Sequence, residues 1–370
     1  MKKVMIAIGN AGGGHIACAN AVKDALLKRD SSLDVLIVDI FELSKFSKNY
    51  DTFYYLISRY RIFEILFNLS YWLIDRSKII SKLVIFFSTQ SLYKPTLEFL
   101  REEKPDMVIC NNGVVVRVIG KCREDLEFKY VVTVPDLISV SRWWADRNAD
   151  LIFCPLSETV ENLKKFCKEC RYTAGYYPLK EVKEYSDQEV VKLKRKFFSR
   201  YSFKMDTPTI LITGCGFATR EIIKNLEKFV KESNYQFLVL VGRDEGLKED
   251  LLRTFKGSKN IVIEGYTTEI LDLFAISDLI IAKPGPATLL EIEKIGRKAI
   301  FTRPVGYQEW GNVEYLLKNP NFVYVGSKFK LIPNEIEKLL SREIEYHKPV
   351  IKDSDALVEY LYSRSNLVES

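Results

Sequence analysis

The sequence predicts an α/β protein made of two Rossmann-like domains that face each other across a cleft. Two observations indicate this fold class. Short apolar, β-branched runs alternate with stretches of helical periodicity, which is the pattern of a parallel sheet covered by helices on both faces. The alternation stops in a charged segment after about residue 175 and then starts again, and a chain of 370 residues is too long for one ordinary core.

The first domain is expected over residues 1–175. It opens with the run KVMIAI at 3–8, which reads as a buried strand and leads into a glycine turn and a helix. Another helix is expected from Ser157, whose hydroxyl suits an N-cap position. Further strands are expected at 34–40, 105–110, 129–135 and 150–155.

The second half of the chain repeats this organisation. We expect a linker with one helix over 176–205, a second domain over 206–345, and a C-terminal helix in 346–370 that packs back on the first domain. Strands of the second domain are expected at 209–216, 237–243, 260–266, 278–285 and 298–304.

The ends of these strands carry the residue types that bind ligands. In open parallel sheets, ligands bind beyond the carboxyl ends of the strands, so we expect the site in the cleft between the domains. The residues at these ends are Gly12 to His15, which include Gly13 and Gly14, together with Asp136, Gly214 to Gly216, Tyr266 and the Lys283–Thr288 loop.

The composition argues against several classes of protein. A formal net charge of +6 is too small to indicate nucleic-acid binding. The seven cysteines are scattered, which argues against a disulfide framework and for a reducing, cytoplasmic setting. Cys167 and Cys170 are expected on a helix rather than at a zinc site. We expect neither a secretory signal nor a transmembrane helix, because the apolar runs are too short.

The stretch 46–93 departs from the α/β pattern because aromatic and basic residues are interleaved in it. A core helix would not carry Arg59 and Arg61, and an ordinary surface helix would not expose so many rings. An interfacial membrane helix uses both residue types, so we predict that this stretch binds an anionic membrane surface. The alternatives are a helical subdomain on the first sheet and an oligomer contact. The other basic residues are Lys45, Lys48, Arg76, Lys78 and Lys82.

The segment KPGPATLLEIEKIG (283–296) predicts a phosphate site. A helix that begins near Pro286 offers backbone N–H groups and the positive end of its dipole, and Thr288 adds a hydroxyl. Glu291 lies one turn further on the same face, where a carboxylate suits a ribose diol. The alternative is an ordinary capped helix.

The segment RPVGYQEWGNVEYL (303–316) supplies Gln308, Glu309 and Asn312 after another strand. The Gln-Glu pair at the carboxyl end of a strand offers donor and acceptor groups for sugar hydroxyls, although a surface loop is the alternative.

Several segments together resemble a known family. GGGHIACANAVKDAL is similar to its N-terminal glycine loop and helix, and the segment from DLIIAKPG to GYQEWGNVEYLLKN is similar to its donor site. Three further segments match this family in order and spacing: VVTVPD, DLIFCPLSETVENL and GYTTEILDLFAISDLII. From about residue 4 to 320 the chain resembles the GT-B glycosyltransferases of the monogalactosyldiacylglycerol synthase and processive diacylglycerol glucosyltransferase group, relatives of the MurG-type enzymes.

The resemblance implies an inverting transfer of a hexose from a UDP-sugar to an acceptor hydroxyl. It implies that Glu291 holds the ribose, that Tyr266 lies near the base, and that Gln308 and Glu309, with Asn312 nearby, lie at the donor sugar. The loop of Lys283, Gly285 and Thr288, and the turn of Gly214 and Gly216, would lie against the diphosphate. Enzymes of this kind need no bound metal or other cofactor, because a helix dipole stabilises the leaving diphosphate.

The chain departs from the family pattern at two places. Pro286 stands where the family commonly has a glycine, which removes one backbone donor. Val134 stands where the family commonly has an aspartate, with Asp136 two residues later, and the histidine that commonly follows is absent before Trp143. His15, at a strand end with a glycine turn before it, is one candidate for the general base, and Asp136 is the other.

We therefore predict a cytoplasmic glycosyltransferase, peripheral on the inner face of the cell membrane. Its partners would be a UDP-hexose donor, a glycerolipid acceptor such as diacylglycerol and the anionic membrane surface. One alternative is a UDP-sugar epimerase of the same fold, which would not need the 46–93 stretch. The other is a non-catalytic protein that retains a nucleotide-sugar site. Vesicle sedimentation separates the first alternative from the prediction, and UDP release in the presence of lipid tests the second.

Overall fold

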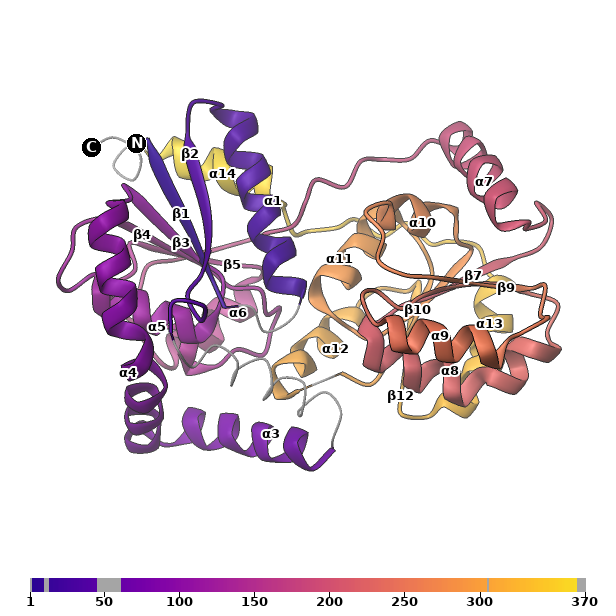
Figure 1. Ribbon diagram of the computed structural model, residues 1–370, viewed down its shortest axis with the longest axis horizontal. Coiled ribbons are helices and arrows are strands. Elements are labelled where there is room, and N and C mark those ends of the chain that lie inside the picture. Colours follow the sequence, from indigo (N-terminus) through magenta and orange to yellow (C-terminus); the bar gives the residue numbers. More distant parts are fainter. Residues whose placement is uncertain (1, 10–12, 45–60, 305, 365–370) are drawn as a thin grey trace. The chain divides into compact units, whose positions relative to one another are not determined.

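The computed structural model describes residues 2–9, 13–44, 61–304 and 306–364, and these residues form two compact units (Figure 1). The first unit takes the chain up to Glu181, the short segment Gly306–Gly311, and the chain from Val350 onwards. The second unit is built from Val182–Val305 and Asn312–Pro349. Gly12 and the first part of the 46–93 stretch, up to residue 60, lie outside the described residues.

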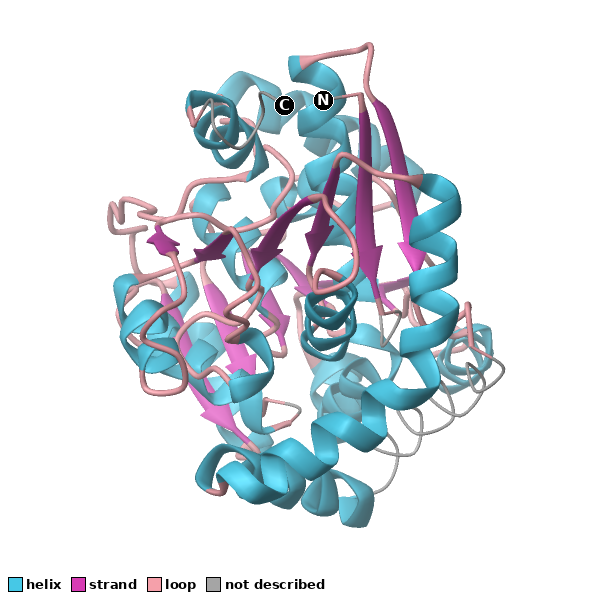
Figure 2. Ribbon diagram, turned by 90° about the vertical axis from the view of Figure 1, so that its left-hand side faces the viewer, coloured by secondary structure: helices cyan, strands magenta, loops and turns pink. Residues whose placement is uncertain are grey.

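The described part of the first unit contains a parallel sheet of six strands in the order β2-β1-β3-β4-β5-β6. Figure 2 shows strands in magenta with helices in cyan around them. The order reverses at β1, which pairs with β2 on one side and with β3 on the other, so the topological switch point lies between the carboxyl ends of β1 and β3. The strands are β1 (Lys3–Ile8), β2 (Asp34–Asp39), β3 (Met107–Cys110), β4 (Lys129–Thr133), β5 (Leu151–Cys154) and β6 (Tyr172–Ala174).

Helices cover both faces of this first sheet. Val4 and Ile6 of β1 pack with the helices α1 and α14, while Met5 and Ala7 of the same strand pack in a second cluster with α4, α5 and α6. The alternation of buried side chains along β1 therefore divides the core into two layers. The helices are α1 (Gly13–Arg29), α3 (Arg61–Arg76), α4 (Lys78–Glu103), α5 (Gly113–Cys122), α6 (Ser157–Lys164) and α14 (Ser354–Ser363), with a 3₁₀ turn, η1 (Arg142–Trp144).

The second unit repeats the architecture with a parallel sheet in the order β12-β11-β10-β7-β8-β9 among its described residues. This is the order of a dinucleotide-binding sheet, with its switch point between β7 and β10. Its strands are β7 (Thr209–Ile212), β8 (Gln236–Leu240), β9 (Ile261–Glu264), β10 (Leu279–Ala282), β11 (Ala299–Thr302) and β12 (Phe322–Gly326). Its helices are α7 (Asp187–Tyr201), α8 (Cys215–Glu232), α9 (Glu245–Thr254), α10 (Ile270–Ile276), α11 (Pro286–Ile295) and α13 (Ile332–Leu340), together with α12 (Trp310–Leu316), whose first two residues group with the first unit.

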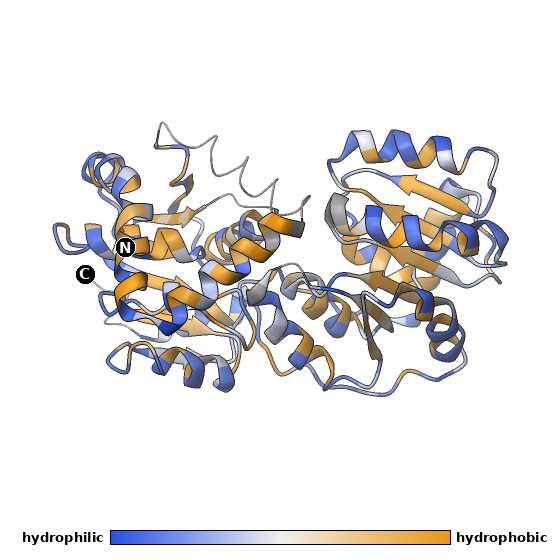
Figure 3. Cartoon of the chain, turned by 90° about the horizontal axis from the view of Figure 1, so that it is seen from below, coloured by the Kyte–Doolittle hydropathy of each residue, from blue (hydrophilic) through white to orange (hydrophobic). Residues whose placement is uncertain are grey.

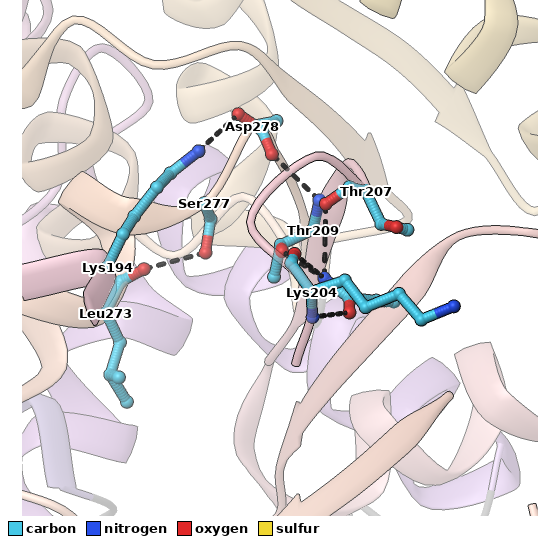
Figure 4. Close-up of polar contacts among 8 residues, drawn as sticks. Lys194, Lys204, Thr207, Thr209, Leu273, Ser277 and Asp278 are labelled. Carbon is cyan, nitrogen blue, oxygen red and sulfur yellow. Dashed lines mark hydrogen bonds and ion pairs between the residues drawn. The ribbon is translucent and has the colours of Figure 1, made fainter. Parts of the chain in front are cut away.

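The amino ends of the strands in this second sheet are held by a polar network (Figure 4). Asp278, just before β10, accepts a hydrogen bond from the backbone N–H of Thr209 at 2.8 Å and pairs with Lys194 of α7 at 3.0 Å. The Gln236 amide donates to the carbonyls of Lys204 and Thr207 at 3.0 and 3.1 Å. These bonds fix α7 and the start of β7 at the edge opposite the carboxyl ends, so they serve the fold rather than a ligand site.

The ten strands expected from the sequence are all present, but four details differ. The short strand β6 and the strand β12 were not expected. The residue at the N-cap of α6 is Leu156, and Ser157 is the first helical residue. Cys167 and Cys170 lie beyond the end of α6 and are joined by a disulfide, so their expected place on a helix is wrong.

Candidate active site

The switch point of the second sheet brings two glycine loops together. Gly214, after β7, has a φ of +156° and caps α8, a conformation that side chains rarely adopt. A Cβ on Gly214 would lie 3.0 Å from the Cβ of Ala218 and 3.5 Å from the backbone nitrogen of Lys283. The loop of Gly214 and Gly216 therefore lies directly beside the loop after β10, as an anion site shared by both loops requires.

The helix α11 begins as the sequence indicated, with Gly285 at the N-cap and Pro286 as its first residue. The Gly285 N–H donates to the carbonyl of Lys283 at 2.8 Å, and proline has no N–H. The backbone donors left at this helix end are those of Ala287 and Thr288, because first-turn N–H groups have no partner within a helix. The Thr288 hydroxyl lies in the same turn.

Glu291 follows Thr288 by three residues, so both project from the same face of α11. Burial raises the pKa of Glu291 to about 7. A half-buried carboxylate close to a helix N-terminus can accept two hydrogen bonds from a vicinal diol. The structure thus places the N–H groups that are predicted to bind the diphosphate and the carboxylate that is predicted to bind the ribose within one and a half turns of the same helix.

Asn312 has a different place from the one expected. It is fully buried and donates its side-chain amide to the carbonyl of Pro284 at 2.9 Å. Asn312 therefore supports the Lys283–Thr288 loop from behind, whereas the sequence suggested a group facing the sugar. Gln308 and Glu309 lie in the 3₁₀ turn Tyr307–Glu309, within the segment that groups with the first unit.

Two arginines at strand ends of the second unit escaped the sequence analysis. Arg303 follows β11 and donates to the carboxylate of Glu221 of α8 at 3.0 Å. Arg243 follows β8, and its guanidinium carbon lies 4.9 Å from the ring centroid of Tyr266, whose side chain is 64% exposed. The signal that could have found them is an arginine within three residues of the end of a buried strand.

At the switch point of the first sheet, two asparagines hold the loop that leads to His15. The Asn111 side chain donates to the His15 carbonyl at 2.8 Å, and the Asn112 side chain donates to the Gly9 carbonyl at 3.3 Å. A Cβ on Gly9 would lie 2.7 Å from the ring of Phe41, so only glycine fits there. Burial lowers the pKa of His15, which keeps the imidazole neutral and able to accept a proton.

Asp136 lies three residues beyond β4 and is held by one strong contact. The indole N–H of Trp144 donates to Asp136 Oδ2 at 2.8 Å. Burial, with a smaller effect from the negative charge of Glu309, raises the pKa of Asp136 to about 7, although the Trp144 hydrogen bond acts in the opposite direction. A carboxylate with a pKa near the working pH is well matched to general-base catalysis.

The structure thus places both candidate bases at the carboxyl edge of one sheet. His15 follows β1 and Asp136 follows β4, with β3 between these strands. Asn111 and Trp144, which position them, were missed from the sequence. The run CNNG after a buried strand was the available signal for Asn111, whereas nothing local marked Trp144 as a partner of Asp136.

The helices α3 and α4 expose an unusual number of large apolar side chains. Figure 3, which colours the chain by hydropathy, shows that several helices carry both hydrophobic and hydrophilic residues. On α3 the exposed positions recur at helical spacing, so they lie on one face. The exposed apolar residues are Ile62, Ile65, Leu66, Leu69 and Trp72 of α3 and Ile79, Leu83, Phe86 and Phe87 of α4. We call this set the α3–α4 apolar face. Among the described residues, no helix is long and apolar enough to cross a membrane.

Comparison with protein families finds a matching family model in each half of the chain. Residues 15–169 match the family model for monogalactosyldiacylglycerol synthase, and residues 209–309 match the model for the glycosyltransferase family 28 C-terminal domain. The processive diacylglycerol β-glucosyltransferase of Bacillus mycoides is 25% identical over 85% of this chain and 80% of that protein. The protein of the same name from Bacillus subtilis is 24% identical over 99% of this chain and 96% of that protein.

Solved structures show the same fold. MurG of Acinetobacter baumannii has a TM-score of 0.58 at 13% identity and covers 98% of this chain and 100% of that one. The UDP-GlcNAc 2-epimerase of Methanocaldococcus jannaschii, solved with UDP-GlcNAc and UDP, has a TM-score of 0.62 at 14% identity, with the same coverage. At these identities the likeness establishes the GT-B fold, as the sequence predicted. The activity has to be argued from the residues of the candidate site.

Proposed function

We propose that this chain is a GT-B glycosyltransferase of the group that contains the monogalactosyldiacylglycerol synthases and the processive diacylglycerol glucosyltransferases, and that it transfers a hexose from a UDP-sugar, with inversion, to the hydroxyl of diacylglycerol in a membrane. The observation that carries the proposal is the α3–α4 apolar face. An epimerase of the same fold acts on a soluble nucleotide-sugar and has no use for such a face, whereas an enzyme with a lipid acceptor must reach the bilayer.

The donor would bind at the switch point of the second sheet. The backbone donors of Ala287 and Thr288, at the positive end of the α11 dipole, would bind the diphosphate, and the Gly214 loop leaves room for it. Glu291 would accept hydrogen bonds from the ribose diol. Tyr266, stacked with Arg243, would offer a flat surface to the base. We expect Gln308 and Glu309 at the donor sugar.

The acceptor would bind at the carboxyl edge of the first sheet. We propose Asp136 as the general base, because Trp144 fixes one of its oxygens and leaves the other for the acceptor hydroxyl. Its proton affinity, raised by burial, suits proton transfer near neutral pH. The neutral His15 imidazole would orient the same hydroxyl. The attacking oxygen then displaces UDP from the opposite side of the anomeric carbon, which inverts it.

The proposal is tested by identifying the product. Purified protein is incubated with a pool of UDP-hexoses and with diacylglycerol in anionic vesicles, and UDP release and lipid products are followed by mass spectrometry. A hexosylated diacylglycerol that forms in step with UDP is the expected result. Conversion of the nucleotide-sugar into an epimer, or UDP release that is independent of lipid, would contradict the proposed reaction.

Replacement of Glu291 by alanine should weaken UDP binding by about 10- to 100-fold, because a hydrogen bond to a charged group contributes roughly 1.5–3 kcal/mol. Isothermal titration calorimetry measures the effect. The matched control is Glu232→Ala, which removes an exposed carboxylate at the far end of α8 and should leave the affinity unchanged. Equal affinity in wild type and Glu291→Ala would remove Glu291 from the site.

Chelators should leave the transferase activity largely intact. In the proposed site, the N–H groups and dipole of α11 do the work that a divalent cation does in metal-dependent enzymes. The measurement compares initial rates with EDTA and with added Mg²⁺ or Mn²⁺. A full loss of activity in EDTA that Mg²⁺ restores would show that the helix end is not sufficient for the leaving diphosphate.

A further inference from the structure

The end of α3 is hydrogen-bonded to the loop that follows β4. Asp75 Oδ1 accepts hydrogen bonds from the Ser141 hydroxyl at 2.8 Å and from the backbone N–H of Arg142 at 2.9 Å. The Arg142 guanidinium donates in return to the backbone carbonyl of Asp75 at 3.2 Å. Three hydrogen bonds therefore join the last turn of a helix to a loop more than sixty residues away in the chain.

This loop carries the side chain that holds the candidate base. Arg142 begins the 3₁₀ turn η1, which ends at Trp144, and the Trp144 indole donates to Asp136. The turn packs tightly on the start of α5, where a Cβ on Gly113 would lie 2.8 Å from the Cβ of Trp143. A three-residue 3₁₀ turn has few hydrogen bonds of its own, so its position depends on such outside contacts.

The same helix carries much of the α3–α4 apolar face. Trp72, three residues before Asp75, is exposed, and the guanidinium carbon of Arg76 lies 4.6 Å from the centroid of its ring. A cation over an exposed aromatic ring suits the headgroup level of a bilayer. Tyr71, which precedes Trp72 in the chain, is half-buried. Burial, with smaller effects of the negative charges of Asp136 and Asp75, raises the pKa of Tyr71.

We propose that Asp75 is a positioning residue that couples the seating of α3 on a lipid surface to the position of the base Asp136. This inference rests on the proposed function. In water the apolar face of α3 is exposed, so its burial in a bilayer would stabilise one position of the helix. When that face enters the bilayer, α3 is held still, Asp75 fixes Ser141 and Arg142, and the Trp144 indole stays on Asp136. Acceptor turnover then requires contact with the membrane in addition to the presence of substrate.

The coupling can be measured at Trp144 without any turnover. In protein labelled with ¹⁵N-tryptophan, the Trp144 indole N–H resonance, assigned with Trp144→Phe, should titrate with the ionisation of Asp136. In Asp75→Ala the indole contact loosens, so the titration midpoint should rise by about one pH unit, the scale of one hydrogen bond to a charged group, or the titration should disappear from this resonance.

Three further variants make the titration specific to the hydrogen bonds that the Asp75 side chain accepts. Asp75→Asn retains an oxygen that can accept both hydrogen bonds and should behave as wild type. Ser141→Ala removes one of the bonds and should have a smaller effect. The matched control, Ser70→Ala, removes a hydroxyl of α3 that only bonds the Phe67 carbonyl of the same helix, and should have none. A Trp144 midpoint in Asp75→Ala equal to that of wild type overturns the proposal.

Kinetics test the link to the lipid surface. With a short-chain diacylglycerol dissolved in water as acceptor, added anionic vesicles without acceptor should raise kcat of the wild type and of Ser70→Ala. They should not raise kcat of Asp75→Ala, while KM for the UDP-sugar stays the same in all three. Equal stimulation of Asp75→Ala overturns the coupling. A wild type that transfers no sugar defeats the proposed function, and the indole titration then still decides whether Asp75 positions Asp136.

Discussion

Asp136→Asn should lower kcat for lipid glycosylation by about 10²- to 10⁴-fold, the range in which a positioned general base contributes. The substitution preserves the size of the side chain and leaves an oxygen that can accept the Trp144 hydrogen bond, so it removes the base without removing the contact. Binding of UDP, whose proposed contacts all come from the second unit, should be unaffected. Initial rates and calorimetric UDP titrations measure the two quantities.

The pH dependence gives a second, independent sign of this role. A base must be ionised to accept a proton, and the pKa of Asp136 is raised to about 7, so wild-type kcat/KM should rise with pH through about 7 and then level off. Since folding raises this pKa above its unfolded value, ionisation of Asp136 costs stability as the pH rises. In Asp136→Asn, kcat/KM should therefore no longer rise with pH through about 7. The variant should also have a higher Tm than wild type at pH 8.

Two variants separate Asp136 from general effects of charge and from His15. Asp125→Asn removes an exposed carboxylate of the same unit and should retain wild-type rates and the same pH profile. His15→Ala should lower the rate but keep the rise of kcat/KM near pH 7, because the proposed role of His15 is to orient the acceptor. If this rise were absent in His15→Ala and present in Asp136→Asn, the two roles would be the reverse of those proposed.

The alternation of strands and helices could be read from the sequence because the strands of a parallel sheet are buried on both faces. Each expected strand is a nearly continuous apolar run, such as 107–110, in which every side chain is buried. The strand β6, which was missed, has only three residues, all half-buried. The strand β12 is an apolar run, FVYVG, at the edge of its sheet, and its burial does not distinguish it from the edge strands β2 and β9, which were expected.

The candidate site was predictable where its parts are consecutive in the chain. The Lys283–Thr288 loop and Glu291 lie within nine residues, so helical geometry alone places them on one end of α11. The contacts that position Asp136, in the other half of the site, join segments that are not consecutive in the chain. The pairing of Asp75 with Ser141 joins distant segments through an irregular loop, and no periodicity or motif indicates it. The role of Trp144 depends on that loop and could only be found from the structure.

Reversal of the basic charges beside the α3–α4 apolar face should release the protein from anionic vesicles. Arg76, Lys78 and Lys82 are exposed next to this face, and each should contribute about 1 kcal/mol near an anionic surface, so Arg76→Glu, Lys78→Glu and Lys82→Glu together should lower vesicle binding by about 100-fold or more. Vesicle sedimentation measures the binding. Turnover of diacylglycerol in vesicles should fall with it, and UDP affinity should not change, because the proposed UDP contacts lie in the other unit.

The matched control carries the same change of charge elsewhere. Lys224, Lys228 and Lys256 are exposed lysines of the second unit, and their reversal should leave vesicle binding almost as in wild type. High salt should release the wild type only in part, because screening removes the electrostatic contribution and leaves the apolar one, whereas Trp72→Ser with Phe87→Ser should weaken binding even at high salt. If both charge-reversed proteins bound vesicles equally well, electrostatic attraction at α3 and α4 would be excluded. If the wild type did not bind vesicles at all, the apolar face would no longer support a lipid acceptor.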